Sequence, residues 1–153
     1  MSESSPFKYD VADASPGFLL WKLMGLWQAR LSQTLSVFEI TQTQYAILAS
    51  LRWFQEHQQL STQAALVTHT KIEKMTLSKA IRQLESFGLV VRTPDGHDKR
   101  AVNVQLTAQG NNIIADAIIA VENADEEFFG VLNETNLCSY KNLTAQIINQ
   151  NDL

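Results

Sequence analysis

Apolar residues recur at helical spacing in the first third of the chain. Five of them follow Pro16 at intervals of three and four residues: Leu20, Met24, Trp27, Leu31 and Leu35. A second apolar set lies beside this stripe, so the pattern predicts a helix that is buried on more than one face. Thr41 precedes a further apolar-periodic segment, residues 42–57, and is expected to be the N-cap of a second helix.

Two shorter helical segments follow. Ser61 or Thr62 is expected to cap a short helix, and a longer helix is expected over residues 73–87 after a brief break. Three apolar residues of the longer helix are expected to point inward: Leu77, Ile81 and Leu84. Gly88 is well placed to end this helix, because glycine adopts the left-handed conformation common at helix C-termini.

The next segment has the periodicity of strands. Residues 89–93 are rich in β-branched side chains, and residues 101–106 alternate between apolar and polar positions. Residues 94–100, which lie between them, combine Pro-Asp-Gly turn chemistry with several charges. The pattern predicts a β-hairpin with a charged tip. Thr107 is expected to cap the next helix, and a last helix is expected over residues 136–149.

This order of elements predicts a mainly α fold with a small β-hairpin, arranged as a winged helix-turn-helix. In such a motif one helix enters the major groove of DNA, a second helix braces it, and the hairpin reaches the backbone or a narrow minor groove. We expect residues 40–107 to form this DNA-binding domain. Residues 16–39 and 108–153 are expected to be dimerisation helices, and residues 1–15 an irregular N-terminal arm.

The flanking helices carry more apolar surface than one amphipathic stripe requires. The residues concerned are Phe18, Leu20, Trp21, Trp27, Phe128, Phe129, Leu137 and Ile147. Such helices either wrap the winged helix or pair across a two-fold axis. We favour pairing, because symmetric proteins match symmetric DNA sites.

Charge is unevenly distributed along the chain. Residues 60–107 contain seven Lys and Arg against four Asp and Glu, a net charge of +3. The rest of the chain contains five against twelve, a net charge of −7, which gives the total of −4. Local positive charge is what contacts phosphates, so the acidic total does not exclude nucleic acid.

Side chains suited to DNA lie on the outward face of the longer helix and in the hairpin. Nine residues are predicted to form the DNA interface: Lys71, Lys74, Thr76, Ser78, Lys79, Arg82, Asp98, Lys99 and Arg100. Lys and Arg bind phosphates or guanine edges, and Ser and Thr bind either phosphates or bases. Asp98 is expected to hold the hairpin tip in shape by pairing with a nearby cation. The alternatives are an ordinary solvated helix face and a simple surface ion pair.

Other classes of function find little support in the sequence. Cys138 is the only cysteine, so an internal disulfide is impossible, and no Cys/His cluster indicates a metal. There is no Ser-His-Asp set and no Gly-rich phosphate loop, so we expect neither an enzyme nor a cofactor. The N-terminus is polar and acidic, and no apolar run reaches about 18 residues, so we expect a cytoplasmic protein without membrane contact.

Four stretches of the chain resemble the MarR family of bacterial regulators. They are PGFLLWK (residues 16–22), ITQTQYAILASL (40–51), LSKAIRQLESFGLVVR (77–92) and DGHDKRAVNVQLTAQG (95–110). The most specific part is Asp98-Lys99-Arg100 followed by Leu106, Thr107 and Gly110. The resemblance covers about residues 16–150, and it departs from the common pattern at Lys71, Glu73 and Lys79.

The resemblance implies a two-fold dimer built from the first and last helices. It also implies recognition helices in successive major grooves, with the wings in the flanking minor grooves. Many relatives release DNA when a small aromatic or phenolic ligand binds between the dimer and DNA-binding regions. We therefore expect a homodimeric DNA-binding transcriptional regulator, a repressor, that responds to such an effector.

Three aromatic residues are candidates for an effector pocket: Trp21, Trp53 and Phe54. They are also ordinary candidates for the hydrophobic core. Two alternative functions remain open from the residues alone. The first is a DNA-binding regulator without a ligand, and the second is a winged helix that contacts only proteins.

Overall fold

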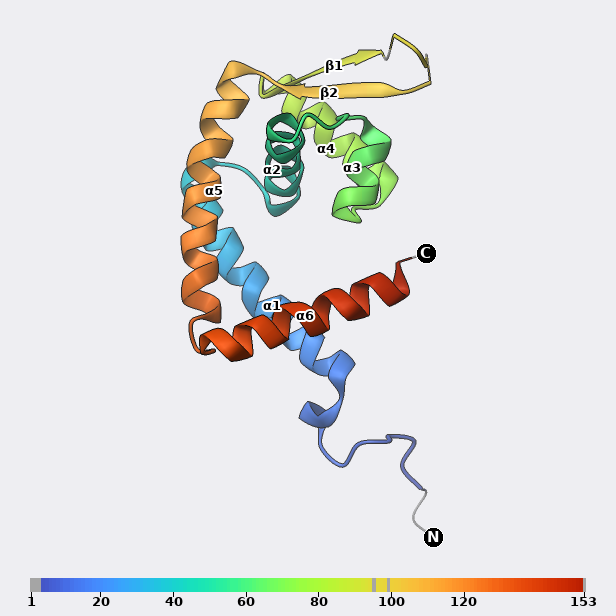
Figure 1. Cartoon of the computed structure of the whole chain (residues 1–153), viewed down its shortest axis with the longest axis vertical. Helices are drawn as coiled ribbons and strands as arrows, with labels where there is room; N and C mark the ends of the chain where they lie inside the picture. Colours follow the sequence, from blue (N-terminus) through green and yellow to red (C-terminus); the bar gives the residue numbers. More distant parts are fainter. Residues whose placement is uncertain (1–3, 95, 99, 153) are drawn as a thin grey trace.

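The computed structural model describes residues 4–94, 96–98 and 100–152, and it confirms a mainly α fold with one small hairpin (Figure 1). The elements are η1 (Ala12–Ala14), α1 (Pro16–Leu35), η2 (Ser36–Phe38), α2 (Gln42–Glu56), α3 (Gln63–Thr70), α4 (Lys74–Ser86), β1 (Val90–Pro94), β2 (Val102–Leu106), α5 (Ala108–Phe129) and α6 (Glu134–Asn151).

Threonine side chains mark the starts of three helices. Thr41, Thr62 and Thr107 each accept a hydrogen bond at Oγ1 from the backbone N–H three residues later, at 3.0–3.1 Å. Each bond satisfies one of the N–H groups that a helix leaves without an internal partner. The predicted caps at Thr41 and Thr107 are confirmed, and Thr62 is the cap of α3. Asn133 caps α6, which begins two residues before the predicted start.

The hairpin is an antiparallel pair with its inner face on the core. Val90 lies opposite Leu106 and Pro94 lies opposite Val102. Val104 is fully buried, and its N–H donates to the carbonyl of Ser61 at 2.8 Å. The segment that leads into α3 therefore runs along the second edge of β2.

Two glycines join the base of the hairpin to the neighbouring helices. Gly88 has a φ of +74°, the left-handed conformation that glycine adopts without strain, and it follows the C-terminus of α4. Its carbonyl accepts a hydrogen bond of 2.7 Å from Thr107 Oγ1. A Cβ on Gly110 would lie 2.0 Å from the carbonyl oxygen of Leu89, so only glycine allows α5 to approach β1 this closely. The wing is thus attached to both α4 and α5.

The core lies between the C-terminal end of α1, α2, α3, α4, the hairpin and α5. It is made of Leu31, Leu35, Ile40, Ile47, Leu48, Leu51, Phe54, Leu66, Leu77, Ala80, Ile81, Leu84, Leu89, Val90, Val104, Ile114, Ala117 and Val121. Figure 1 shows the hairpin, α2, α3 and α4 gathered at one end, whereas α6 and the start of α1 extend at the other. No described residue of α6 is buried, and several apolar side chains of α1 and α6 face outward. No described helix is long and apolar enough to cross a membrane.

Candidate nucleic-acid interface

The turn between α3 and α4 is a compact left-handed bend. Lys71 has a φ of 61°, and its N–H donates to the carbonyl of Val67 at 2.9 Å. Thr70 Oγ1 donates to the carbonyl of Leu66 at 2.7 Å and accepts from the N–H of Ile72 at 3.2 Å. The departure from the common family pattern at Lys71 is therefore compatible with an ordered turn, although a lysine in this conformation carries some steric cost.

Glu73 begins the second helix of the motif. Its carboxylate is the N-cap of α4, and Oε2 accepts from the N–H of Thr76 at 3.0 Å and from its hydroxyl at 3.3 Å. The backbone amides of Met75 and Thr76, in that order of effect, hold the pKa of Glu73 below its usual value. A carboxylate therefore does here what a threonine hydroxyl does at the starts of α2, α3 and α5. It also places negative charge at the positive end of the helix dipole.

α4 has a buried face and an exposed face. The buried face consists of Leu77, Ala80, Ile81 and Leu84. Lys74, Thr76, Lys79 and Arg82 are exposed, and Ser78 is half-buried. Among the residues that the structure describes, Lys74, Lys79 and Arg82 form no ion pair with a carboxylate. These three cations on one surface therefore have no acidic neighbour in salt-bridge contact within the described ranges.

Lys71 differs from these three cations. Its Nζ lies 2.6 Å from Oδ1 of Asp152, the residue that follows α6. Both side chains are about half exposed, so the pair contributes little to stability. It does bring the end of the last helix against the turn of the helix-turn-helix motif.

Asp98 makes two local hydrogen bonds in the described part of the hairpin tip. Its Oδ1 accepts a hydrogen bond from the N–H of Arg100 at 2.9 Å, and its carbonyl accepts from Ala101 at 3.0 Å. Arg100 is exposed. Lys99, the third wing residue predicted to contact DNA, lies outside the described residues.

An ion pair that the sequence analysis missed connects the wing to α4. Arg92 Nη2 lies 3.1 Å from Glu85 Oε1, and the Arg92 N–H donates to Oε2 at 3.2 Å. The Arg92 guanidinium lowers the pKa of Glu85. The side chain and the backbone of Arg92 both bond to the Glu85 carboxylate, which restricts rotation of β1 relative to α4. The hairpin and the exposed face of α4 are therefore held in a defined relative position.

Two of the residues predicted to contact DNA line one cavity. A cavity of about 440 Å³ lies between α3, the start of α4 and the hairpin, and both Lys74 and Arg100 line it. The structure therefore brings a cation of the helix and a cation of the wing to a common site.

The three aromatic residues predicted for an effector pocket occupy three different environments. Trp21 is 78% exposed on α1, and Phe54 is 4% exposed in the core, in edge contact with His69. Trp53 is half exposed and stacks on His57 at a centroid distance of 3.9 Å. They line no common cavity among those found.

Trp53 lines a cavity of about 400 Å³ between α2 and α5. Its other walls include Tyr45, Arg52, Glu56 and Glu122. Arg52 Nε donates to Glu56 at 2.8 Å. Burial, together with the charges of Glu122 and Asp125, raises the pKa of Tyr45 to about 12, so its hydroxyl stays protonated at neutral pH. The cavity offers an aromatic face, a phenol, a guanidinium that is paired with Glu56, and the carboxylate of Glu122.

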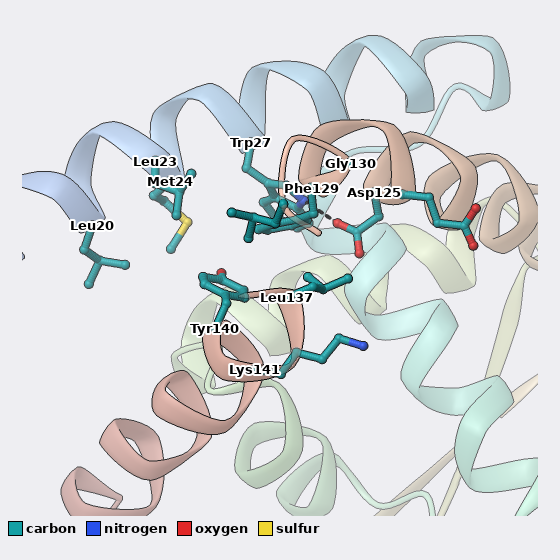
Figure 2. A pocket seen from close by; sticks show the side chains of 12 residues that line it. Leu20, Leu23, Met24, Trp27, Asp125, Phe129, Gly130, Leu137, Tyr140 and Lys141 are labelled. Atoms are coloured by element: carbon teal, nitrogen blue, oxygen red, sulfur yellow. Dashed lines mark hydrogen bonds between the residues drawn. The ribbon is translucent and has the colours of Figure 1, made fainter. Parts of the chain in front are cut away.

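A larger cavity of about 520 Å³ lies between α1, the end of α5 and α6 (Figure 2). Trp27 Nε1 donates to Asp125 Oδ1 at 3.0 Å, and the ring of Phe129 lies 5.0 Å from that of Tyr140. Figure 2 shows Leu20, Met24 and Tyr140 around the opening between α1 and α6. The stripe on α1 was visible in the sequence, but its apposition to α6 was not.

Comparison with known proteins identifies relatives of this arrangement. The family model that matches describes an ArnR1-like winged-helix domain and spans residues 36–123. The HTH-type transcriptional regulator YdcH of Bacillus subtilis is 33% identical over 122 residues, which are 80% of this chain and 83% of that protein. The transcriptional regulator HosA of Escherichia coli is 32% identical over 111 residues, 72% of this chain and 79% of that protein.

Solved structures share the fold. Bordetella bronchiseptica BpsR, whose DNA binding is regulated by 6-hydroxynicotinic acid, superposes with a TM-score of 0.81 at 24% identity, covering 94% of this chain and 97% of that one. A cysteine-to-serine mutant of MarR from E. coli, complexed with operator DNA, gives a TM-score of 0.80 at 24% identity, covering 92% of this chain and 99% of that one.

The cap at Glu73 can be tested by hydrogen exchange. We expect Glu73→Ala to speed exchange of the Thr76 amide roughly fivefold at neutral pH, the factor typical for loss of an N-cap, while Leu84 stays protected. Glu73→Asp is the control, because aspartate is itself a good N-cap. Since the pKa of Glu73 is lowered in the folded state, the stabilisation by its carboxylate is present at neutral pH and is lost as the pH falls through that lowered pKa. Unchanged Thr76 exchange in Glu73→Ala would contradict the assignment.

Proposed function

The chain belongs to the MarR family of winged helix-turn-helix transcriptional regulators, and we propose on this premise that it is a sequence-specific repressor that binds operator DNA as a homodimer. One observation carries the proposal. The exposed face of α4 presents Lys79 and Arg82 without a carboxylate partner among the described residues, beside a wing that presents Arg100.

The proposed interface places α4 in the major groove. An α-helix with its side chains is about 10–12 Å wide, and the groove is about 12 Å wide. Nine residues take part: Lys71, Lys74, Thr76, Ser78, Lys79, Arg82, Asp98, Lys99 and Arg100. The helix cations bind phosphates or guanine edges, and the hydroxyls bind bases or phosphates. Lys99 and Arg100 reach the flanking minor groove, with Asp98 holding the tip of the wing in shape.

Residues 16–39 and 108–153 are proposed to form the dimer, with residues 40–107 as the DNA-binding domain and residues 1–15 as an N-terminal arm. Support comes from α1 and α6, whose apolar side chains Leu20, Trp21, Leu143 and Ile147 are all more than half exposed in the single chain. A second copy that covers these helices would remove this surface from water. Repression would then follow from occupancy of the operator, which excludes other proteins from the same site.

The cavity between α2 and α5 is the proposed effector site. Trp53 supplies a face on which an aromatic ring can stack, and Arg52 supplies a guanidinium for a carboxylate. BpsR, the relative regulated by 6-hydroxynicotinic acid, supports a small aromatic acid as the class of ligand. A ligand there would lie between a helix of the proposed DNA-binding domain and one of the proposed dimerisation helices.

DNA contact is tested by the salt dependence of binding to a random-sequence duplex of about 30 base pairs. Each phosphate contact removed lowers the slope of log K against log salt by about 0.9. We expect the Lys79→Ala, Arg82→Ala, Arg100→Ala triple variant to bind more weakly with a shallower slope. Lys8→Ala, which removes a cation from the N-terminal segment, should bind as the unaltered protein does. An unchanged affinity and slope in the triple variant would exclude this surface.

The dimer is tested by light scattering of the full chain at micromolar concentration. We expect a mass of twice 17.2 kDa. Trp21→Asp, which puts a charge into the exposed apolar surface of α1, should shift the mass toward that of one chain. A single-chain mass for the unaltered protein would contradict the dimer.

The effector site is tested by thermal shift with 6-hydroxynicotinic acid and a panel of phenolic acids. A ligand at 100 times its Kd stabilises the folded state by about 2.7 kcal/mol. We expect at least one compound to raise Tm, and Trp53→Ala to abolish the shift. Phe7→Ala is the control, because Phe7 is 83% exposed in the N-terminal arm and lines neither the cavity between α2 and α5 nor the core. No shift with any compound would argue for a regulator without a ligand.

A further inference from the structure

Met75 is an apolar side chain on the otherwise polar outward surface of α4. It is 71% exposed, in the first turn of the helix, and it is not among the apolar residues packed against the core. Methionine is normally buried in folded proteins. Because Met75 is exposed, packing within this chain does not explain why a methionine stands at this position.

The geometry of α4 places Met75 at the centre of the outward surface. Met75, Ser78, Lys79 and Arg82 follow the spacing i, i+3, i+4 and i+7, which lines up on one side of a helix. The buried residues Leu77, Ala80, Ile81 and Leu84 lie on the opposite side. The N–H and the hydroxyl of Thr76, the next residue, both donate to the carboxylate of Glu73, so the first turn of α4, which carries the methionine, is held at its N-cap.

We propose that Met75 is a specificity-determining residue that contacts the 5-methyl group of thymine in the major groove. The inference rests on the proposed function, in which α4 is the recognition helix. Thymine is the only base that presents a methyl group in that groove, and apolar side chains read it by contact. The N-terminal residues of a recognition helix are those that reach the base edges, and Met75 is the second residue of α4.

The neighbours of Met75 favour DNA over an apolar protein surface as the occupant. Lys74 and Lys79 flank it and are exposed, and neither forms an ion pair with a described carboxylate. An apolar partner would have to bury these charges without neutralising them, which is costly. A phosphate-lined groove neutralises the cations and offers the methyl group at its floor. Because the methionine side chain is unbranched and flexible, it can adapt its conformation to the shape of the groove.

The test compares duplexes that differ by one methyl group. The probe is the highest-affinity duplex recovered from a random pool, with each thymine replaced in turn by deoxyuracil, which keeps the base pairing and the O4 acceptor. We expect one or two replacements in each half-site to weaken binding about fourfold each, the factor for one methyl group removed from apolar contact. Met75→Ala should bind the thymine duplex more weakly and should not distinguish thymine from deoxyuracil at those positions. Met75→Leu should keep the distinction.

Val11→Ala is the matched control, since Val11 is 63% exposed in the N-terminal arm, outside both the proposed dimerisation helices and the proposed DNA-binding domain. It should retain both the affinity and the thymine preference. An unaltered protein that is indifferent to every deoxyuracil replacement would overturn the proposal, as would a Met75→Ala variant that keeps the full preference. In either case, the proposed function stands if the unaltered protein shows salt-dependent DNA binding that the Lys79→Ala, Arg82→Ala, Arg100→Ala variant has lost. If the unaltered protein shows no such binding, both the proposed function and the role of Met75 are excluded.

Discussion

The burial of one face of α4 is the constraint on which the rest of the interface depends. Leu77, Ile81 and Leu84 are fully removed from solvent. Burying such side chains is worth about 1.5–3 kcal/mol each, on the order of 5–9 kcal/mol together as an upper estimate. That is comparable with the whole stability of a typical domain. A rotation of α4 by about 100° would bring Ser78 to the position of Leu77, so the helix has one orientation and its outward residues are fixed by its inward ones.

Local contacts then transmit this orientation to the neighbouring elements. Glu73 fixes where α4 begins, and the ion pair between Glu85 and Arg92 connects its far end to the wing. The close approach at Gly110 and the hydrogen bond from Thr107 to Gly88 connect the wing to α5. α5 in turn packs against α1 and α2. A ligand between α2 and α5 would therefore act on a helix that contacts both the core beneath α4 and the base of the wing.

The parts of this architecture that the sequence predicted depend on neighbours in the chain. Caps at Thr41 and Thr107 and a helix over residues 73–87 follow from local hydrogen bonding and from apolar spacing, and the structure places α4 within one residue at each end. The antiparallel hairpin likewise follows from its alternation and its turn residues.

The parts that were missed depend on contacts between elements. Trp21, Trp53 and Phe54 look alike in composition, but their exposures differ because each helix packs differently. The Glu85–Arg92 pair joins a helix to a strand, and the cavity along α1 and α6 joins helices about a hundred residues apart. The spacing of Met75 from Ser78, Lys79 and Arg82 already places it on the outward side of α4, and its exposed fraction confirms that position.

In the proposed dimer, two copies of α4 read DNA from a fixed, outward orientation. Selection of bound duplexes from a random pool by the full chain tests it most directly. We expect enrichment of a palindrome whose half-sites lie about one helical turn apart, roughly 10 base pairs from centre to centre, because a two-fold dimer presents two recognition helices to successive major grooves. Recovery of a sequence without two-fold symmetry, or no enrichment above the starting pool, would contradict it.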